Sequence, residues 1–341
     1  MNNKPFISVS IKTLNESECI EKTIDSIRQQ LRGYPHKIIV ADSLSTDNTQ
    51  QLAGDKGVMV VSLTEPGDRC CGVGHQLGYL YSEGDYILLM DGDMELEPGF
   101  IDRAVTFLEA NSEYAGVAGT VEMDEAANYE FISRKQRLDT IYPVGDCDHL
   151  GGGGLYRRSA IRKIGYLTNR NLHAYEEAEL GLRLLEHGYK LHRLNIPYFR
   201  HTSYTLPTFK MLRYRWRSGY YQGMGEILRS AWGKPYFSTV VKMVKSEVVF
   251  LLYLMLLVCS VFTLNMDIVG VALLPLLVFI VLKTIKNRSL VNGLYSAMNM
   301  TIRAAGLLKG LMQPMRDPIV PPGNKIIHRY CHQFSADRCE H

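Results

Sequence analysis

Residues 85–93 read Asp-Tyr-Ile-Leu-Leu-Met-Asp-Gly-Asp. The apolar run from Tyr86 to Met90 predicts a buried strand, and Asp91 and Asp93 follow it directly. In sheets of parallel strands, ligands bind beyond the carboxyl ends of the strands. Mg²⁺ and Mn²⁺ take oxygen ligands and usually share them with substrate phosphates. The two aspartates are therefore candidate metal ligands, and the alternative is a turn with two solvated acids.

The residues before this strand alternate between short apolar runs and helical patterns. The predicted strands are Phe6–Ile11, Lys37–Ala41, Val58–Leu63 and Asp85–Met90, and predicted helices follow them, starting near Asn15, Thr46, Gly74 and Pro98. This alternation predicts an α/β fold with a mostly parallel sheet flanked by helices. Polar clusters at Thr13–Glu16, Asp42–Ser43 and Asp91–Asp93 should then meet at one edge of the sheet.

Three of these helix starts are predicted from residues that favour helix N-termini. Asn15 is placed to cap the first helix, with Glu18 three residues later as its capping-box partner. Ser45 is placed to cap a helix at Thr46–Ala53. Pro98 opens a later helix at the favoured first position.

The composition excludes some classes of protein. Of 341 residues, 46% are hydrophobic and 21% are charged, which is typical of a packed globule. The net charge is +3 without a basic stripe, so no nucleic-acid partner is expected. The seven cysteines fit no disulfide framework, which favours free thiols in a reducing compartment.

The composition changes near Ser246, where two apolar runs begin. Val248–Leu264 and Ile268–Leu282 are each near the lower limit of ~17 residues for a membrane-spanning helix, and they predict a transmembrane hairpin. Basic residues flank both of its ends: Lys242, Lys245, Lys283, Lys286 and Arg288. Positive flanks place both ends in the cytoplasm. The alternative is a buried helical hairpin of a soluble protein.

The last helical pattern covers residues 290–312. Its apolar positions recur at helical spacing, with Arg303 and Lys309 elsewhere. This pattern indicates either a helix lying in the membrane interface or a helix packed on the catalytic domain. The expected regions are a catalytic domain at 1–232, a juxtamembrane segment at 233–245, two transmembrane helices within 246–288, and an interfacial helix with a C-terminal tail at 289–341.

Five ordered motifs resemble those of the family 2 glycosyltransferases, which have the GT-A fold. They are Val9–Glu16, Val40–Asp47, Gly84–Asp93, Gly151–Arg158 and Glu176–Leu180. Each motif alone is a weak signal, whereas five in order are specific. The resemblance implies an inverting transferase of the membrane-anchored bacterial type, which takes a sugar from a nucleotide-diphosphate sugar.

The resemblance also implies roles for single residues. In the family, Thr13, Asn15 and Glu16 would belong to the donor loop, and Asp42 would contact the base of the nucleotide. Asp93 and Asp91 would bind the metal. Gly153 would line the sugar and acceptor site, and Glu177 would be the catalytic base. Ser43 and Leu44 stand where the family usually has an acid and a glycine. The choice between UDP- and GDP-sugars therefore stays open.

Helical geometry also separates Glu177 from its acidic neighbours. Successive residues turn by roughly 100° in an α-helix. Glu176 and Glu179 then share a polar face with Arg183, while Glu177 falls among apolar residues such as Leu184. An acid in that position has either a partner or a purpose. The alternative is a first-turn acid that complements the helix dipole.

Three further residues are candidates. His201 resembles a histidine that some family members use near the metal, and a structural histidine is the alternative. Arg215 and Trp216 lie in a stretch that resembles the Q-R-x-R-W motif of polymerising members. They could hold the diphosphate and the acceptor, and an ordinary amphipathic helix is the alternative.

The sequence thus predicts a metal-dependent glycosyltransferase with a carboxylate base. Its catalytic domain faces the cytoplasm from a multi-pass anchor in the plasma (inner) membrane, and its acceptor is a lipid-linked or membrane-proximal glycan. A sugar nucleotidyltransferase would need a glycine-rich phosphate loop after the first strand, where this chain has Thr13–Glu16. A non-catalytic membrane scaffold on the same fold is the other alternative.

Overall fold

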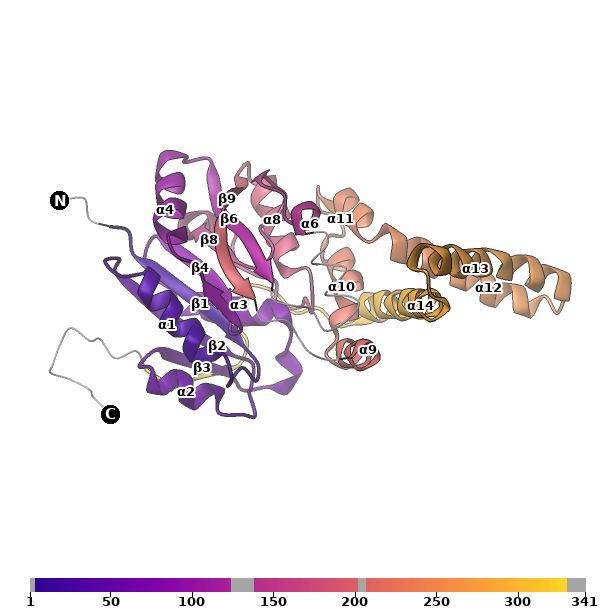
Figure 1. Ribbon diagram of the computed structural model, residues 1–341, viewed down its shortest axis with the longest axis horizontal. Helices are drawn as coiled ribbons and strands as arrows, with labels where there is room; N and C mark the ends of the chain where they lie inside the picture. The colour runs from indigo at the N-terminus through magenta and orange to yellow at the C-terminus, as the bar shows by residue number, and fades with distance from the viewer. Residues whose placement is uncertain (1–3, 124–137, 202–206, 330–341) are drawn as a thin grey trace. The chain divides into compact units, whose positions relative to one another are not determined.

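The chain divides into two compact units. The computed structural model describes residues 4–123, 138–201 and 207–329. The first unit runs up to Thr208 and resumes at Arg316, and the second unit is Phe209–Met315 (Figure 1). The division at 208/209 lies inside the range 1–232 expected for the catalytic domain.

A sheet of ten strands forms the frame of the first unit, in the order β10-β3-β2-β1-β4-β8-β6-β9-β5, with β7 paired to β9. The strands are β1 (Ile7–Thr13), β2 (His36–Asp42), β3 (Met59–Leu63), β4 (Tyr86–Asp91), β5 (Met94–Leu96), β6 (Tyr114–Met123), β7 (Gly145–Asp146), β8 (Gly154–Arg157), β9 (Lys190–His201) and β10 (Asn324–His328). The neighbours β3, β2, β1 and β4 are parallel, and β8 pairs antiparallel with β4. The predicted α/β fold is therefore confirmed, but the sheet is mixed rather than mostly parallel, because β10, β8, β5 and β7 all pair antiparallel with their neighbours.

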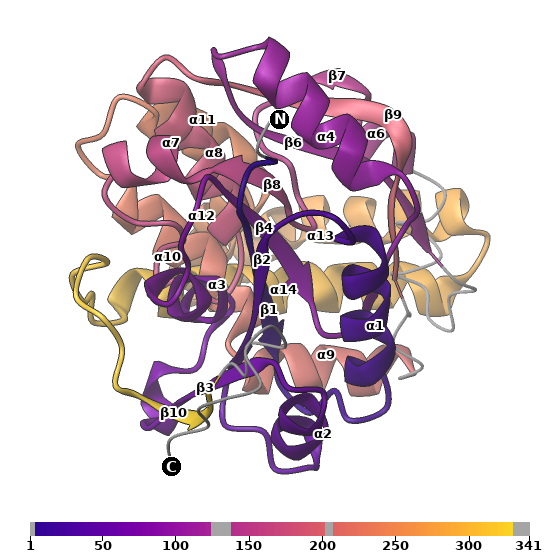
Figure 2. The same ribbon diagram turned by 90° about the vertical axis from the view of Figure 1, so that its left-hand side faces the viewer.

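The helices of the first unit cover both faces of this sheet. They are α1 (Ile20–Gln30), α2 (Thr49–Asp55), η1 (Pro66–Asp68), α3 (Cys71–Leu80), α4 (Phe100–Ala110), α6 (Leu138–Ile141), α7 (Arg158–Lys163) and α8 (Glu176–Glu186). Figure 2 shows α1 and α4 on one side of the sheet and α3, α7 and α8 on the other.

The alternation of side chains along β2 explains why both faces are covered. Successive residues of a strand point to opposite faces. Ile38 and Val40 join the main core together with Ile24 of α1. Ile39 packs in a separate cluster that includes Val73 of α3. A central parallel strand of this kind is apolar on both faces, as the sequence pattern predicts.

The predicted helix starts differ from the structure. α1 begins at Ile20, and Cys19 occupies the cap position without a side-chain capping hydrogen bond. α2 begins at Thr49, and α4 begins at Phe100 after Gly99. Each of these helices starts two to five residues later than the capping patterns suggest.

The polar residues expected to cap α1 and α2 instead bridge two loops. Asn15 adopts a left-handed backbone conformation, with φ of 61°. Its side-chain oxygen accepts a hydrogen bond from the Thr46 N–H at 2.8 Å, and its own N–H donates to Ser45 Oγ at 2.9 Å. These bonds tie the loop after β1 to the loop after β2, so the residues are not available as caps.

The segment after residue 315 returns to the first unit and contributes a strand. β10 pairs antiparallel with β3, and the Tyr81 hydroxyl donates a hydrogen bond to Asn324 Oδ1 at 2.6 Å. The segment is also held by Arg316, which forms an ion pair with the buried Asp68. The sequence pattern indicated only a tail here, whereas the structure has a strand that covers the edge of β3.

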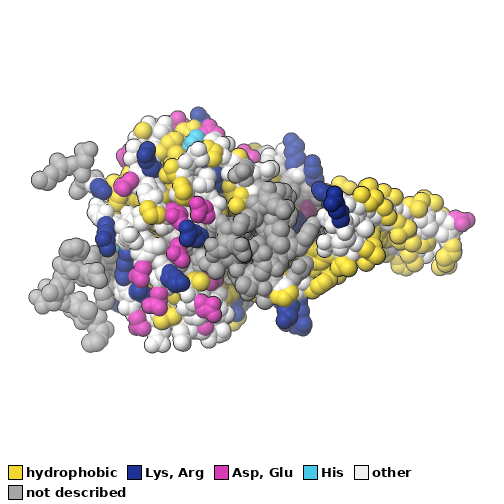
Figure 3. All heavy atoms as spheres, viewed as in Figure 1, with side chains coloured by type: hydrophobic (Ala, Val, Ile, Leu, Met, Phe, Trp, Pro, Cys, Tyr) yellow, Lys and Arg dark blue, Asp and Glu magenta, His cyan; other side chains and the backbone are white. Residues whose placement is uncertain are grey.

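The second unit is helical. It contains α9 (Thr208–Arg217, beginning at the last residue of the first unit), η2 (Tyr220–Gln222), α10 (Gly223–Ser230), α11 (Phe237–Met243), α12 (Lys245–Phe262), α13 (Met266–Asn287) and α14 (Leu290–Met312). Pro275 lies inside α13 without ending it. By length and composition, α12 and α13 could each cross a membrane, and almost none of their residues are buried. Figure 3 shows hydrophobic side chains covering this hairpin, with Lys and Arg side chains near one end of it.

Small residues allow α14 to pack closely within the second unit. A Cβ on Gly310 or on Gly306 would overlap the backbone of η2, and a Cβ on Gly293 would lie 3.0 Å from the Ile280 carbonyl oxygen of α13. Arg303 of α14 also forms an ion pair with the buried Glu247 of α12. One face of α14 is therefore buried against other helices of this unit.

Candidate active site

The carboxyl ends of β1, β2 and β4 lie side by side, as the parallel order predicts. Thr13 is in register with Asp42, and Lys12 with Asp91. The polar clusters that follow the three strands therefore meet at one edge of the sheet.

Asp42 is buried and fully engaged by protein groups. Its carboxylate accepts hydrogen bonds from the side chains of Ser45, Gln50, Ser62 and Thr13 and from the backbone N–H of Ser45. In this arrangement Asp42 orders the loop after β2 and the start of β3. A contact with a nucleotide base would require one of these bonds to be exchanged.

Glu16 lies beside the two aspartates of the metal motif. A Cβ on Gly92 would fall 2.9 Å from Glu16 Cγ and 2.8 Å from Thr13 Cγ2, so only glycine lets the loop after β1 approach the Asp-Gly-Asp turn. Burial, and then the charges of Asp93 and Asp91, raise the pKa of Glu16 to about 8. Three carboxyl groups thus crowd into one half-buried region.

This crowding fits the binding of a divalent cation together with substrate oxygens. Carboxylates that repel one another at a strand end are stabilised by a cation. Among the residues that the structure describes, no three His, Cys, Asp or Glu side chains hold a metal ion by themselves. Mg²⁺ and Mn²⁺ in phosphate-transfer sites are usually held by one or two carboxylates and by substrate phosphates, so Asp91, Asp93 and Glu16 suit that role.

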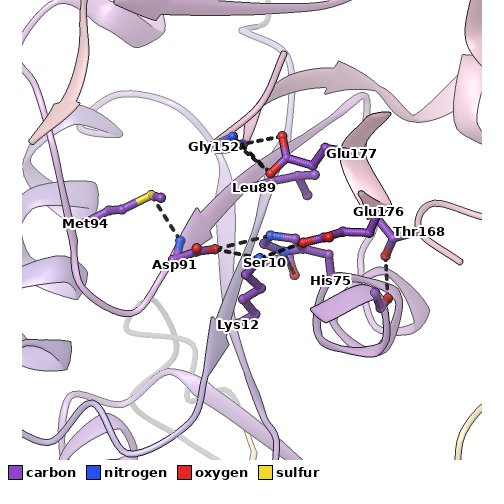
Figure 4. Close-up of polar contacts among 12 residues, drawn as sticks. Ser10, Lys12, His75, Leu89, Asp91, Met94, Gly152, Thr168, Glu176 and Glu177 are labelled. Carbon is purple, nitrogen blue, oxygen red and sulfur yellow. Dashed lines mark hydrogen bonds and ion pairs between the residues drawn. The ribbon is translucent and has the colours of Figure 1, made fainter. Parts of the chain in front are cut away.

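Lys12 forms ion pairs that link Asp91, at the end of β4, to the first residue of α8. Its ammonium lies 3.3 Å from Asp91 Oδ1 and 3.1 Å from Glu176 Oε1. Burial lowers the pKa of Lys12, but the two carboxylates raise it well above its usual value, so the group stays charged. His75 completes the network, with Nε2 3.6 Å from Asp91 Oδ1 and Nδ1 3.4 Å from Ser10 Oγ (Figure 4).

Glu177 is held by the glycine run before β8. Its Oε1 accepts hydrogen bonds from the Gly152 and Gly153 N–H groups at 3.1 and 3.0 Å, and its Oε2 accepts from Gly153 at 3.0 Å (Figure 4). Gly151 to Gly154 all have φ between 56° and 145°, a region that favours glycine. This backbone conformation lets Gly152 and Gly153 direct their N–H groups at the Glu177 carboxylate.

Burial sets the acidity of Glu177. It raises the pKa, Lys12 and the Gly153 N–H lower it, and Glu176 and Asp91 raise it again, which leaves a value of about 7. A carboxyl group with a pKa near the working pH is suited to accept a proton in catalysis.

The expected contrast in burial between Glu177 and its neighbours is wrong. Glu176 and Glu179 are 8% and 2% exposed, whereas Glu177 is half-buried. The predicted pair of Glu179 with Arg183 is present at 2.8 Å but lies in the interior, where Tyr166 also donates to Glu179. What distinguishes Glu177 is its glycine cradle, not an apolar face of the helix.

The remaining candidates are His201 on β9 and Arg215 and Trp216 on α9. The backbone of His201 pairs with Met94, the residue after Asp93, but its side chain is outside the described residues. Arg215 and Trp216 belong to α9, where Arg215 stacks on the Tyr220 ring at 4.4 Å and Lys309 lies 5.7 Å from the Trp216 ring. Both contacts lie within the second unit, and Trp216 is 40% exposed.

Residues 8–165 match the family described as Glycosyl transferase family 2. This part of the chain is a family 2 glycosyltransferase domain. Its relatives include the protein EpsE of Bacillus subtilis (strain 168), whose name places it among glycosyltransferases. EpsE is 28% identical to this chain over 209 residues, which are 57% of this chain and 72% of EpsE. Dolichol-phosphate mannosyltransferase of Pyrococcus furiosus is 28% identical over 132 residues, 38% of this chain and 37% of the enzyme.

A solved structure shares the fold of this glycosyltransferase. It is the mannosyltransferase PcManGT from Pyrobaculum calidifontis in complex with GDP-Man and Mn²⁺, with a TM-score of 0.59 and 17% identity over 91% of this chain and 88% of that one. At this identity the likeness concerns the fold, which is the GT-A fold.

Sequence reasoning missed Lys12 and His75 in the site of this glycosyltransferase. Lys12 lies inside an apolar strand, and His75 lies in a helix whose pattern carries no motif. The unusual charge within the run Ile7–Thr13 was the one available signal, because a lysine inside a buried strand requires partners.

Proposed function

We propose that this glycosyltransferase moves a sugar from a nucleotide-diphosphate sugar to an acceptor hydroxyl, with inversion and with a divalent metal. One observation carries the proposal. The acidic group Asp91, Asp93 and Glu16 follows the carboxyl ends of β1 and β4, and Lys12 links Asp91 of this group to Glu176, the residue before Glu177.

Glu177 is the proposed base. Its carboxylate, oriented by the Gly152 and Gly153 N–H groups, takes the proton of the acceptor hydroxyl. The hydroxyl oxygen then attacks the anomeric carbon, and the bond from that carbon to the diphosphate oxygen breaks on the opposite face. The nucleoside diphosphate leaves with the electron pair of that bond.

Asp93, with Asp91 and Glu16, would hold the metal. When bound, a divalent cation neutralises charge on the departing diphosphate. We propose that Asp93 is a direct ligand and that Asp91, already bound to Lys12, contacts the ribose or a metal-bound water. The donor loop residues Thr13 and Asn15 would face the nucleotide.

The donor is proposed to be a UDP- or GDP-sugar. Support comes from the solved mannosyltransferase of the same fold, whose complex holds GDP-Man and Mn²⁺. Asp42 is the candidate for contact with the base, although it must exchange an internal hydrogen bond to make that contact.

The acceptor is proposed to be a lipid-linked or membrane-proximal glycan. α12 and α13 would cross the plasma (inner) membrane as a hairpin, because their apolar side chains are exposed over nearly their whole length. The basic residues at the open end of the hairpin favour a cytoplasmic location for both of its ends and for the catalytic unit.

Thermal unfolding in the presence of nucleotides tests the donor proposal. A ligand at 100 times its Kd stabilises the native state by about 2.7 kcal/mol. We expect one nucleoside diphosphate and its sugar to raise Tm with Mn²⁺ and much less with a chelator, and we expect Asp93→Asn to lose the metal-dependent part. The absence of a shift with every UDP- and GDP-compound would contradict the proposal.

A further inference from the structure

The ammonium of Lys12 is enclosed by three elements that are distant in sequence. Lys12 lies on β1, Asp91 ends β4, and Glu176 is the first residue of α8. The nitrogen is within 3.3 Å of a carboxylate oxygen from each of the other two elements (Figure 4). The Lys12 side chain is 20% exposed and that of Glu176 is 10% exposed, so solvent screens the second pair weakly.

The neighbouring helix is shaped to admit this side chain. A Cβ on Gly74 of α3 would fall 2.7 Å from Lys12 Cβ and 3.5 Å from its Cδ. Because atoms that close must move apart, any larger residue at position 74 would displace the lysine stem. Glycine inside a helix costs roughly 1 kcal/mol relative to alanine, and here it leaves room for Lys12.

The first turn of α8 depends on contacts from outside the helix. Its N-cap residue, Tyr175, has a left-handed backbone with φ of 69°, and no side chain caps the helix. The carboxylates of its first two residues are instead held by Lys12 and by the glycine run, respectively. The next residue after the lysine-bound Glu176 is the proposed base, Glu177.

We propose that Lys12 is a positioning residue that fixes the first turn of α8, and with it Glu177, relative to the donor-binding end of β4. This inference rests on the proposed function for its catalytic consequence. The clamp itself, an ammonium between Asp91 and Glu176, is a property of the fold and can be tested without any sugar.

Lys12→Met and Lys12→Arg separate positioning from folding. Misplacing a catalytic group by ~1 Å can cost about 100-fold in rate. We expect Lys12→Met to lower kcat by about that factor while the donor KM changes by less than about threefold, and Lys12→Arg to restore part of the loss. Lys37→Met is the matched control, because Lys37 on β2 is also 20% exposed and pairs with Glu83. It should keep its kcat.

Hydrogen exchange provides the readout that is independent of activity. In Lys12→Met, the amides of residues 176–179 should exchange faster than in the unaltered protein, and Lys37→Met should leave them unchanged. Unchanged exchange in α8 would overturn the inference, and so would loss of kcat that Lys12→Arg does not restore at all. If the unaltered protein transfers no sugar from any donor, the proposed function fails, while the exchange result still decides the clamp.

Discussion

At the residue scale, Glu177 combines fixed backbone donors with a raised pKa. It accepts hydrogen bonds from two backbone N–H groups, which favour its charged form. Burial and the nearby acids outweigh them, and its pKa is about 7. The carboxylate is therefore both fixed in position and able to take up a proton near neutral pH.

Replacing Glu177 by Gln should remove the base and keep the shape of the site. The glutamine oxygen can still accept from the Gly153 N–H, so donor binding should persist, while turnover falls by a factor of at least ~100. Steady-state kinetics with donor titration measures both. Glu179→Gln is the control: it weakens the interior pair with Arg183 and should lower stability more than it lowers kcat. Normal turnover in Glu177→Gln would rule out the assignment.

The activity should also depend on pH through Glu177. Only the ionised carboxylate can accept a proton, so kcat/KM should rise as pH increases through about 7 and level off above it. A pH profile of kcat/KM between 5 and 9, on the order of one point per half unit, measures this limb. A profile that is flat through pH 7, with the enzyme folded throughout, would contradict the role given to Glu177.

At the element scale, the glycine run before β8 has a backbone conformation and a close approach to β4 that a larger residue at position 153 would disturb. Gly153 has φ of 92°, and a Cβ there would overlap the Leu89 carbonyl oxygen. That oxygen also accepts a hydrogen bond from the buried Tyr198 hydroxyl at 2.6 Å. Since the N–H of Gly153 is one of the donors to Glu177, displacement of this residue disturbs the proposed base.

Gly153→Ala should lose both stability and turnover. Gly165→Ala is its matched control, because Gly165 has φ of 93° and a Cβ there meets nothing within 4 Å. The left-handed conformation alone costs roughly 1–2 kcal/mol, so both variants should lose that much free energy of unfolding. Only Gly153→Ala should also lose most of its kcat. Equal kcat values in the two variants would show that the glycine cradle is not needed for catalysis.

The four parallel strands β1 to β4 could be predicted from the sequence, whereas the helix starts and the edge strand β10 could not, for a physical reason. Strands such as Tyr86–Asp91 are buried on both faces, so their apolar runs are visible locally. Helix capping depends on whether a polar side chain forms its hydrogen bond with the helix N-terminus or with another part of the chain. The Asn15 side chain accepts a hydrogen bond from Thr46, in the loop after β2, and does not cap the start of α1. Thr46 is distant in sequence, so the local pattern around Asn15 does not reveal this partner.

The candidate site could also be predicted only in part. Asp91, Asp93 and Glu177 follow from motifs and strand ends. Lys12 does not, because its partners Asp91 and Glu176 come from elements that meet only in the folded chain. The burial of Glu179 was missed because Tyr166 and Arg183 satisfy it in the interior.

At the scale of the whole molecule, the second unit bears the exposed apolar surface and the first unit bears the candidate site. The two helices that could cross a membrane expose residues such as Phe262 and Met266, each 80% accessible. A contiguous apolar surface of this kind requires a partner, and the proposed partner is the lipid bilayer.

The proposed hairpin predicts which positions are accessible from each side of the membrane. In a background without the native cysteines, Met266→Cys at the turn and Lys286→Cys at the end of α13 should react with a membrane-impermeant reagent from opposite sides of sealed vesicles. Met266 lies at the far end of the hairpin from Lys286 because α13 spans Met266–Asn287. Labelling of both positions from the same side would exclude the hairpin.

The central claim is transfer of a sugar from a nucleotide donor with Glu177 as the base. The most direct measurement follows labelled UDP- and GDP-sugars incubated with Mn²⁺, acceptor-containing membranes and either the unaltered protein or its Glu177→Gln variant. The account predicts that label from one donor enters the membrane glycans or lipids with the unaltered protein, and that Glu177→Gln binds this donor but transfers at least ~100-fold more slowly. Equal transfer by the two proteins, or none by the unaltered protein from any donor, would contradict it.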